Sequence, residues 1–162
     1  PAFAEVVKKE PKAILVIAGG DDEGYGKNIK SQISNLKISD RVIFTGMLVL
    51  GEEMAALRDS NIFVMPSYSE SFGMAVVEAM SVGLPVVVAK GVGISPYIAQ
   101  AEAGIVVEKN VIQIMEAILK ILGNPDLAKK IGKNGKKLVE EEFSSEKVAE
   151  KWIKEYNDLI KK

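Results

Sequence analysis

The sequence predicts a doubly wound α/β domain built on a parallel sheet of about five strands. The chain has 162 residues, 48% of them hydrophobic and 27% charged, which is typical of one globular domain with a sizeable core. Short continuous apolar runs, rich in valine and isoleucine, alternate with helical patterns between Lys12 and Val107. Continuous apolar strands of this kind are typical of parallel sheets that helices cover on both faces.

The first part of the chain alternates helix and strand. Residues 1–10 place apolar side chains on one helical face, and residues 13–18 form a β-branched run that ends at a Gly-Gly pair, as a buried strand does. A polar loop and a helix at residues 27–36 lead to a second strand at residues 41–45. A short helix is expected at residues 52–60.

Three more strands follow. Residues 62–65 form a strand that stops at a proline, and residues 72–82 form an apolar helix that stops at a glycine. The fourth and fifth strands are residues 85–89 and 104–107. The remaining helices are expected at 111–122, 125–142 and 144–161, the last capped by Ser144 or Ser145. Because parallel sheets bind ligands at the carboxyl ends of their strands, the loops that follow the strands are the places to search for a site.

Composition excludes several classes of function. Lys and Arg number 21 against 22 Asp and Glu, and the net charge of -1 disfavours a nucleic-acid partner. Without cysteine or histidine there is no disulfide, no thiolate or imidazole metal ligand and no Ser-His-Asp triad. We expect no membrane span and no signal peptide, and hence a cytoplasmic protein. The preference for lysine over arginine and the lack of cysteine indicate a thermophile.

The loop after the first strand is rich in glycine but does not fit a phosphate loop. Asn28 stands where a P-loop has Ser or Thr, and Ile29 stands where a dinucleotide loop has its third glycine. Asp21, Asp22 and Glu23 would repel phosphate. These acids form either a divalent-ion site or a solvated turn, and the turn is the favoured interpretation.

The loop after the third strand has the strongest signal. A helix opens near Phe72 and Gly73, and the amides of a first helical turn are unpaired at the positive end of the helix dipole. Gly73 has no side chain to keep an anion at a distance. The turn is therefore a candidate cradle for a phosphate or diphosphate.

Two acids flank this cradle. Glu78 lies in an otherwise apolar helix, where burial would require a hydrogen-bonding ligand, and helical side chains lean toward the N-terminus. Glu70 precedes the helix. Together they would bracket a molecule with hydroxyls at both ends and phosphate in the middle, as in a nucleotide sugar. There are simpler alternatives. Glu70 could be an acid that the helix dipole stabilises, Glu78 could lie on an exposed stripe, and Phe72 and Met74 could belong to the core.

The segment from Glu70 to Glu78 resembles the E-x7-E motif of the retaining glycosyltransferases with the GT-B fold, the group 1 glycosyltransferases. Further similar stretches are AFAEVVKKEP, LVIAGG, RVIFTG, IFVMPSYSESFGMAVVEAMSVGLPVVVAK, AGIVVEKN and FSSEKVAEKW, which together cover nearly the whole chain. The resemblance implies that residues 1–162 are a single nucleotide-sugar-binding domain, the C-terminal, Rossmann-like half of a GT-B fold. It also implies truncation within the first helix and the absence of the acceptor domain.

The resemblance also implies roles for individual residues. Glu78 matches the acid that binds the ribose hydroxyls, and Leu48 matches the segment that lies against the base. Glu70 matches the acid that contacts the donor sugar, and we expect it to be the catalytic residue through positioning and electrostatics. The turn whose backbone meets the sugar and diphosphate corresponds to Phe72, Gly73, Met74 and Ala75.

The implied reaction transfers a sugar from a UDP-, GDP- or ADP-sugar with retention, and without a metal or other cofactor. A saccharide or lipid-linked acceptor would be held by the missing domain, with a peripheral membrane contact in the full-length enzyme. The family's Arg and Lys diphosphate clamp is absent, and residues 91–97 replace its common Gly-Gly-x-Pro-Glu segment. We therefore expect the fragment to be inactive by itself. The lost strand would lie in mid-sheet, so either the strands at 13–18 and 62–65 close up or a neighbouring chain fills the gap.

Two alternatives from other classes remain open. A sugar-nucleotide epimerase can share the fold, but it needs acid–base residues that the motif does not supply. A flavodoxin- or receiver-like module shares the topology, but a receiver needs acids at several strand ends, and here only the first strand has them. The lysines at 129–137 form either an anionic-surface contact or a solvated helix face, the favoured interpretation. Trp152 and Tyr156 are expected to pack on the body of the domain or on the absent half.

Overall fold

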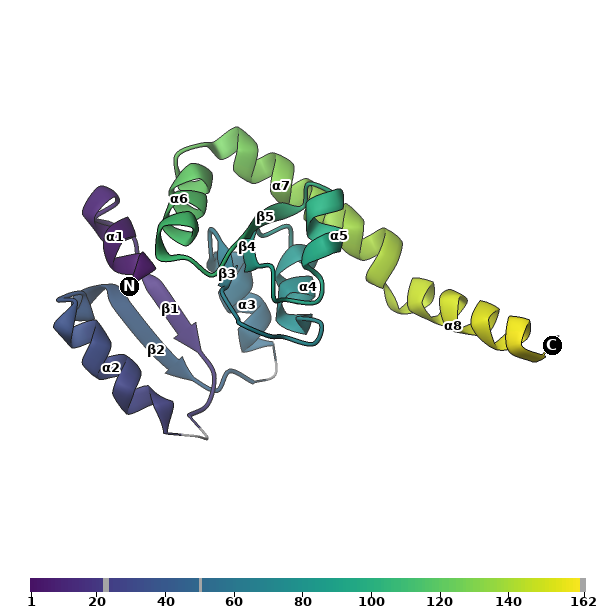
Figure 1. The fold of residues 1–162 in the computed structure, drawn as a ribbon, viewed down its shortest axis with the longest axis horizontal. Helices are drawn as coiled ribbons and strands as arrows, with labels where there is room; N and C mark the ends of the chain where they lie inside the picture. Colours follow the sequence, from purple (N-terminus) through teal and green to yellow (C-terminus); the bar gives the residue numbers. More distant parts are fainter. Residues whose placement is uncertain (22–23, 50, 161–162) are drawn as a thin grey trace.

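The computed structural model describes residues 1–21, 24–49 and 51–160. Helices and strands alternate along the chain, close to the positions that the apolar pattern predicts (Figure 1). In order they are α1 (Ala2–Lys9), β1 (Leu15–Ala18), α2 (Tyr25–Asn35), a 3-10 turn η1 (Ser39–Arg41), β2 (Val42–Gly46), α3 (Glu52–Asp59), β3 (Phe63–Met65), α4 (Met74–Ser81), β4 (Val86–Ala89), α5 (Ser95–Gln100), β5 (Gly104–Val107), α6 (Val111–Leu122), α7 (Pro125–Leu138), a π-helical segment η2 (Val139–Phe143) and α8 (Ser145–Ile160).

The strands form two parallel sheets instead of one. A two-stranded sheet pairs β1 with β2, and a three-stranded sheet has the order β3-β4-β5 (Figure 1). In the second sheet, Val86 lies opposite both Phe63 and Gly104. The α/β class and the five parallel strands are thus confirmed. The expectation that β1 and β3 could close up into one sheet is wrong, because these two strands belong to separate sheets.

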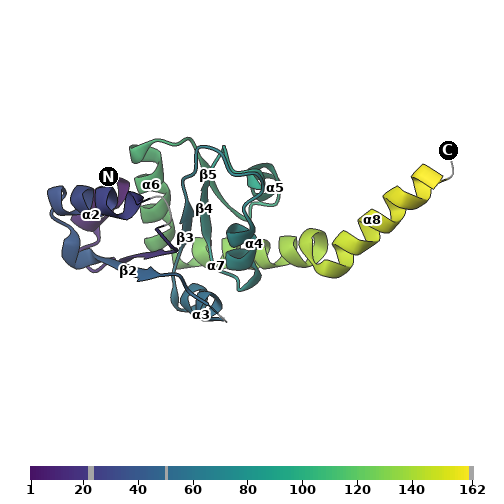
Figure 2. The same ribbon diagram turned by 90° about the horizontal axis from the view of Figure 1, so that it is seen from below.

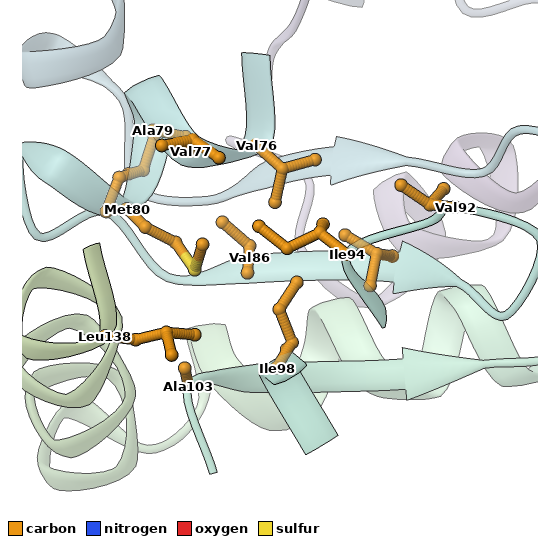
Figure 3. Close-up of a cluster of buried hydrophobic side chains, with 12 residues drawn as sticks. Val76, Val77, Ala79, Met80, Val86, Val92, Ile94, Ile98, Ala103 and Leu138 are labelled. Carbon is orange, nitrogen blue, oxygen red and sulfur yellow. The ribbon is translucent and has the colours of Figure 1, made fainter. Parts of the chain in front are cut away.

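The three-stranded sheet has a core on each of its faces. Val86 and Val88 of the central strand β4 join one buried cluster, which also contains Met80 of α4 and Ile98 of α5 (Figure 3). Val87, between them, joins a second cluster with residues of α6 and α7. Successive strand residues point to opposite faces, so a strand covered on both faces is apolar at every position. All four residues of β4 are buried accordingly. The three-stranded sheet with α4 to α7 and η2 is called the body below.

The two-stranded sheet is covered more thinly. A small cluster with Ala4, Ile33 and Ile38 at its centre packs β1 and β2 against α1 and α2, and α1 also packs on α6. Apolar side chains on the other face remain open, such as Val16, which is 46% exposed. Burial therefore alternates along β1, and the prediction of a strand buried on both faces is wrong there. The sheet β1–β2 with α1 and α2 is called the N-terminal unit below.

The last helix leaves the body. Ser144 is extended and its Oγ accepts a hydrogen bond from the Lys147 amide at 3.3 Å, which identifies it as the cap of α8. Figures 1 and 2 show α8 projecting away from the domain at the end opposite the N-terminal unit. Trp152 and Tyr156 are each 58% exposed and stack on one another with ring centroids 5.8 Å apart. The expectation that they pack on the body is therefore wrong, because the break at Ser144 turns the helix outward.

The basic stretch lies on the outer face of α7. Its lysines, 129, 130, 133, 136 and 137, are all exposed, which fits the favoured interpretation of a solvated helix face. Lys130 pairs with Glu102 at 2.6 Å. Within the ranges that the structure describes, no helix is both long and apolar enough to cross a membrane.

Candidate functional site

The loop between β3 and α4 lies beside the loop that follows β4 and is hydrogen-bonded to it through the backbone. The Glu70 amide donates to the Gly91 carbonyl at 3.1 Å, and the Gly93 amide donates back to the Glu70 carbonyl at 2.9 Å. The Ile94 amide then donates to the Phe72 carbonyl at 3.0 Å. These bonds extend the parallel pairing of β3 and β4 beyond the strand ends, as a bridge between Glu70 and Val92. The backbone from Glu70 to Phe72 is therefore held in place by the body.

Two glycines make this close approach feasible. A Cβ atom at Gly91 would lie 2.1 Å from the Tyr68 carbonyl oxygen, and one at Gly93 would lie 2.1 Å from the Ser71 carbonyl oxygen. Any side chain at either position would push the two loops apart. The sequence did not predict that these two glycines support the turn, although the Gly-x-Gly spacing directly after an apolar strand was the available signal.

Gly73 begins α4 in the left-handed region, with φ of 100°. A side chain there would be strained, and its Cβ would lie 2.9 Å from Cγ1 of Val92, which packs near Val76 in the core (Figure 3). Within the described residues no side chain caps this helix, so the amides of Met74 and Ala75 precede the first amide bonded inside the turn. The turn has the uncapped helix end that the sequence predicts, and Gly73 is needed there for packing. Its role in admitting an anion stays a prediction.

The two acids of the motif differ in their surroundings. Glu70 is half-buried, its Cγ lies 3.7 Å from the place of a Cβ on Gly73, and its Oε1 accepts a long hydrogen bond from Ser71 Oγ at 3.4 Å. Glu78 is exposed on α4. The alternative that Glu78 lies on an exposed stripe therefore holds, and the expectation of burial is wrong, because Val77 and Ala79 point into the core while Glu78 lies on the outer side. Its role in binding stays a prediction.

The remaining candidate residues are partly brought together. Phe72 is half-buried and packs against the core, whereas Met74 is 60% exposed, so the core alternative holds for Phe72 and fails for Met74. Ala75 is half-buried in the first turn of α4. Leu48 is half-buried between exposed neighbours on a different loop, the one that follows β2 in the N-terminal unit. Five of the seven candidates thus lie at the N-terminus of α4, and Glu78 lies past the first turn of the same helix.

Polar side chains at the carboxyl edge of the body engage one another. Lys90, which follows β4, forms an ion pair with Glu108, which follows β5. The Lys109 ammonium lies over the ring of Tyr68. In the first loop, Asp21 Oδ1 accepts a hydrogen bond from the Gly26 amide at 2.8 Å, while Asp22 and Glu23 lie outside the described residues. Among the residues that are described, no group of three acidic side chains could hold a metal ion.

An aromatic contact reaches the turn from the segment η2, which precedes the last helix. Phe143, the last residue of η2, sets its ring edge-on to Phe72 with centroids 5.4 Å apart, and edge-on to Tyr97 with centroids 5.3 Å apart. The sequence reasoning missed both Tyr97 and Phe143, because neither lies at a periodic spacing from the motif.

A family model described as Glycosyl transferases group 1 matches residues 1–138, which include the whole turn. The chain belongs to the group 1 glycosyltransferases. This family and its Rossmann-like GT-B fold do not favour the epimerase, flavodoxin-like or receiver-like alternatives.

Several known proteins resemble this chain over nearly its whole length. It is 27% identical to N-acetyl-alpha-D-glucosaminyl L-malate synthase of Bacillus anthracis, over 99% of this chain and 41% of that protein. Sucrose-phosphate synthase from Thermosynechococcus elongatus aligns with a TM-score of 0.84 and 28% identity, over 98% of this chain and 41% of that one. TarM of S. aureus, in a complex that contains UDP, aligns with a TM-score of 0.82 and 25% identity, over 94% of this chain and 31% of that one. The chain thus spans less than half the length of each of these proteins.

Proposed function

We propose that this chain is the nucleotide-sugar-binding domain of a retaining glycosyltransferase. The observation that carries the proposal is the turn from Glu70 to Gly73, fixed on the loop after β4 and placed before an uncapped helix terminus. Family membership and a UDP-containing structural neighbour support it. One domain, residues 1–162, would hold the donor, and a domain outside this chain would hold the acceptor.

The donor would lie across the N-terminus of α4. The amides of Met74 and Ala75, with the backbone of Phe72 and Gly73, would take the diphosphate and the near side of the sugar, since helix N-termini bind anions. Glu70, already half-buried beside this turn, would accept hydrogen bonds from the sugar hydroxyls.

The nucleoside would extend outward from this turn. Glu78 is exposed, so its carboxylate is accessible to the ribose hydroxyls. Leu48 would lie against the base, which belongs to a uridine, guanosine or adenosine diphosphate. Together with the turn, Glu78 and Leu48 would form the donor site that the resemblance implies.

The reaction would replace the diphosphate oxygen on the anomeric carbon by an acceptor hydroxyl, with retention of configuration and without a metal ion. The leaving diphosphate needs positive groups, and the α4 amides supply part of them. The rest would come from outside this chain, so the chain alone would bind a donor without turning it over. Glu70 would act by positioning and electrostatics.

The acceptor would be a saccharide or a lipid-linked molecule, and a lipid acceptor would bring the full-length enzyme to a membrane surface. A cytoplasmic location and a thermophilic origin, which composition indicates, stay predictions.

Titration calorimetry with UDP, GDP and ADP tests the proposal. We expect one nucleotide to bind preferentially and Glu78→Gln to weaken its binding about tenfold, the loss of a charged hydrogen bond. Glu116→Gln is the matched control, because Glu116 is also exposed on a helix but lies on α6. Binding of no nucleotide at millimolar concentration, or equal weakening by both substitutions, would refute this donor site.

A further inference from the structure

The C-terminal half of α7 runs back along α4 toward the turn from Glu70 to Gly73. At the C-terminal end of α4, a Cβ on Gly132 would lie 2.1 Å from the Gly83 carbonyl oxygen, so the two backbones touch there. Further on, a Cβ on Gly135 would lie 3.1 Å from Cγ of Met80. The segment η2 continues past Leu138 and also packs on α4. Two glycines therefore bring α7 close enough to carry η2 toward the N-terminus of α4.

Phe143 stands at the end of this run and reaches the turn itself. Its ring is edge-on to Phe72 at an interplanar angle of 76° and edge-on to Tyr97 at the same angle, the geometry that aromatic pairs prefer. Both Phe72 and Phe143 are half-buried and pack against the cluster that contains Val92 and Ile94. The Phe72 ring is therefore held between the core cluster and the Phe143 ring.

The residue that Phe143 covers is central to the turn. Phe72 lies between Glu70 and Gly73, and its carbonyl accepts the Ile94 amide at 3.0 Å. Movement of the Phe72 ring would loosen this bond and shift the backbone on both sides of it. Phe143 is also the last residue of a π-helical segment, and π-helical turns are rare and frequently found at functional sites.

We propose that Phe143 is a positioning residue that holds the turn from Glu70 to Gly73 in its donor-binding conformation. The donor-binding part of this inference rests on the proposed function. The part that concerns the contact between Phe143 and Phe72 does not depend on the proposed function, because it concerns only how firmly the turn is held in one conformation. Phe143 lies beyond residues 1–138, the part of the chain that matches the family.

The test measures hydrogen exchange at the amides of Glu70, Gly93 and Ile94, and nucleotide binding by calorimetry. We expect Phe143→Ala to speed exchange at these amides at least tenfold, with β4 unaffected, and to weaken nucleotide binding at least fivefold. Phe143→Tyr keeps the ring and should restore both. Tyr156→Ala is the matched control, an exposed aromatic residue of α8 that stacks on Trp152 instead of the turn, and it should change neither.

The outcomes separate the two proposals. Unchanged exchange at the three amides in Phe143→Ala would overturn the positioning role, and so would equal acceleration throughout β3, β4 and β5, which indicates general destabilisation. The positioning role is also overturned if Phe143→Tyr fails to restore slow exchange while the protein stays folded. If the unaltered chain binds no nucleotide while Phe143→Ala still speeds exchange locally, the hold on the turn is supported and the donor-binding role is rejected.

Discussion

The N-terminal unit and the body contain strands of nearly the same composition and bury them very differently. LVIA in β1 leaves Val16 46% exposed, whereas VVVA in β4 leaves Val87 1% exposed. β4 has a strand on each side and helices on both faces, while β1 has one strand partner and one covered face. An apolar run therefore shows only that the side chains of a strand are suited to burial. The strands and helices packed around that strand determine how much of its surface is buried.

The candidate site divides along the same line. The turn from Glu70 to Gly73 is bonded to the body through Gly91, Gly93 and Ile94. Leu48 follows β2 and belongs to the N-terminal unit. The part of the site that would bind sugar and diphosphate is therefore built on the better packed region, and the part that would bind the base is built on the thinner one.

The largest expected effect comes from adding one methyl group where the body is tightest. Gly93→Ala would place its Cβ 2.1 Å from the Ser71 carbonyl oxygen, so it should lower the free energy of unfolding by about 3 kcal/mol or more. Gly46→Ala at the end of β2 meets nothing within 4 Å, and only its φ of 71° is unfavourable, which costs about 1 kcal/mol. Urea unfolding of both variants measures the difference. Equal losses would show that the body is no more tightly packed here than the N-terminal unit.

A smaller effect separates the two sheets directly. Val87→Ala removes two buried carbons and leaves a cavity, so we expect a loss of about 2 kcal/mol in the free energy of unfolding. Val16→Ala removes the same atoms from a half-exposed face and should cost about 0.5 kcal/mol or less. Urea unfolding followed by circular dichroism compares them. A Val16→Ala loss as large as that of Val87→Ala would mean that the open face of β1 is covered in solution.

The local elements could be predicted because each depends on a few neighbouring residues. The strand at 104–107 and the helix at 111–122 lie where the apolar pattern places them, whereas the helix predicted at 125–142 is α-helical only to Leu138 and continues as the π-helical segment η2. The division of the strands into two sheets could not be predicted, because the sequence of an apolar strand does not show which distant strand pairs with it. The six-residue helix α5 was missed because it is too short to show a period, although its Pro96 in the first turn is a typical helix start.

The same limit applies to the candidate site. The turn before α4 was found from Gly73 and the acids, which lie close together in sequence. The exposure of Glu78 could not be predicted, because the sequence of an apolar helix does not reveal whether its one acidic side chain faces the core or the solvent. The contact between Phe143 and Phe72 joins residues far apart in the chain, and only the course of α7 along α4 brings them together.

The smallest expected effect tests whether surface charge, in addition to apolar burial, makes the body more stable than the N-terminal unit. Glu102, on the turn between α5 and β5, accepts a hydrogen bond from Lys130 of α7, and this bond and the lysine's charge lower the pKa of the Glu102 carboxyl. The folded pKa then lies below the unfolded one. The pair therefore stabilises the body above the unfolded pKa, and this contribution disappears as the pH falls through the folded pKa.

Because both side chains are exposed, solvent screens the pair and its effect on stability should be within the error of an unfolding experiment. The titration of Glu102 followed by NMR is the sensitive measurement, and Lys130→Ala should raise its pKa toward the ordinary value. Lys133→Ala, an exposed lysine on the same helix, should leave it unchanged. A clear loss of stability in Lys130→Ala at pH 7, absent at pH 3, would contradict the view that the body owes its advantage to apolar burial. It would place part of that advantage in the ion pair.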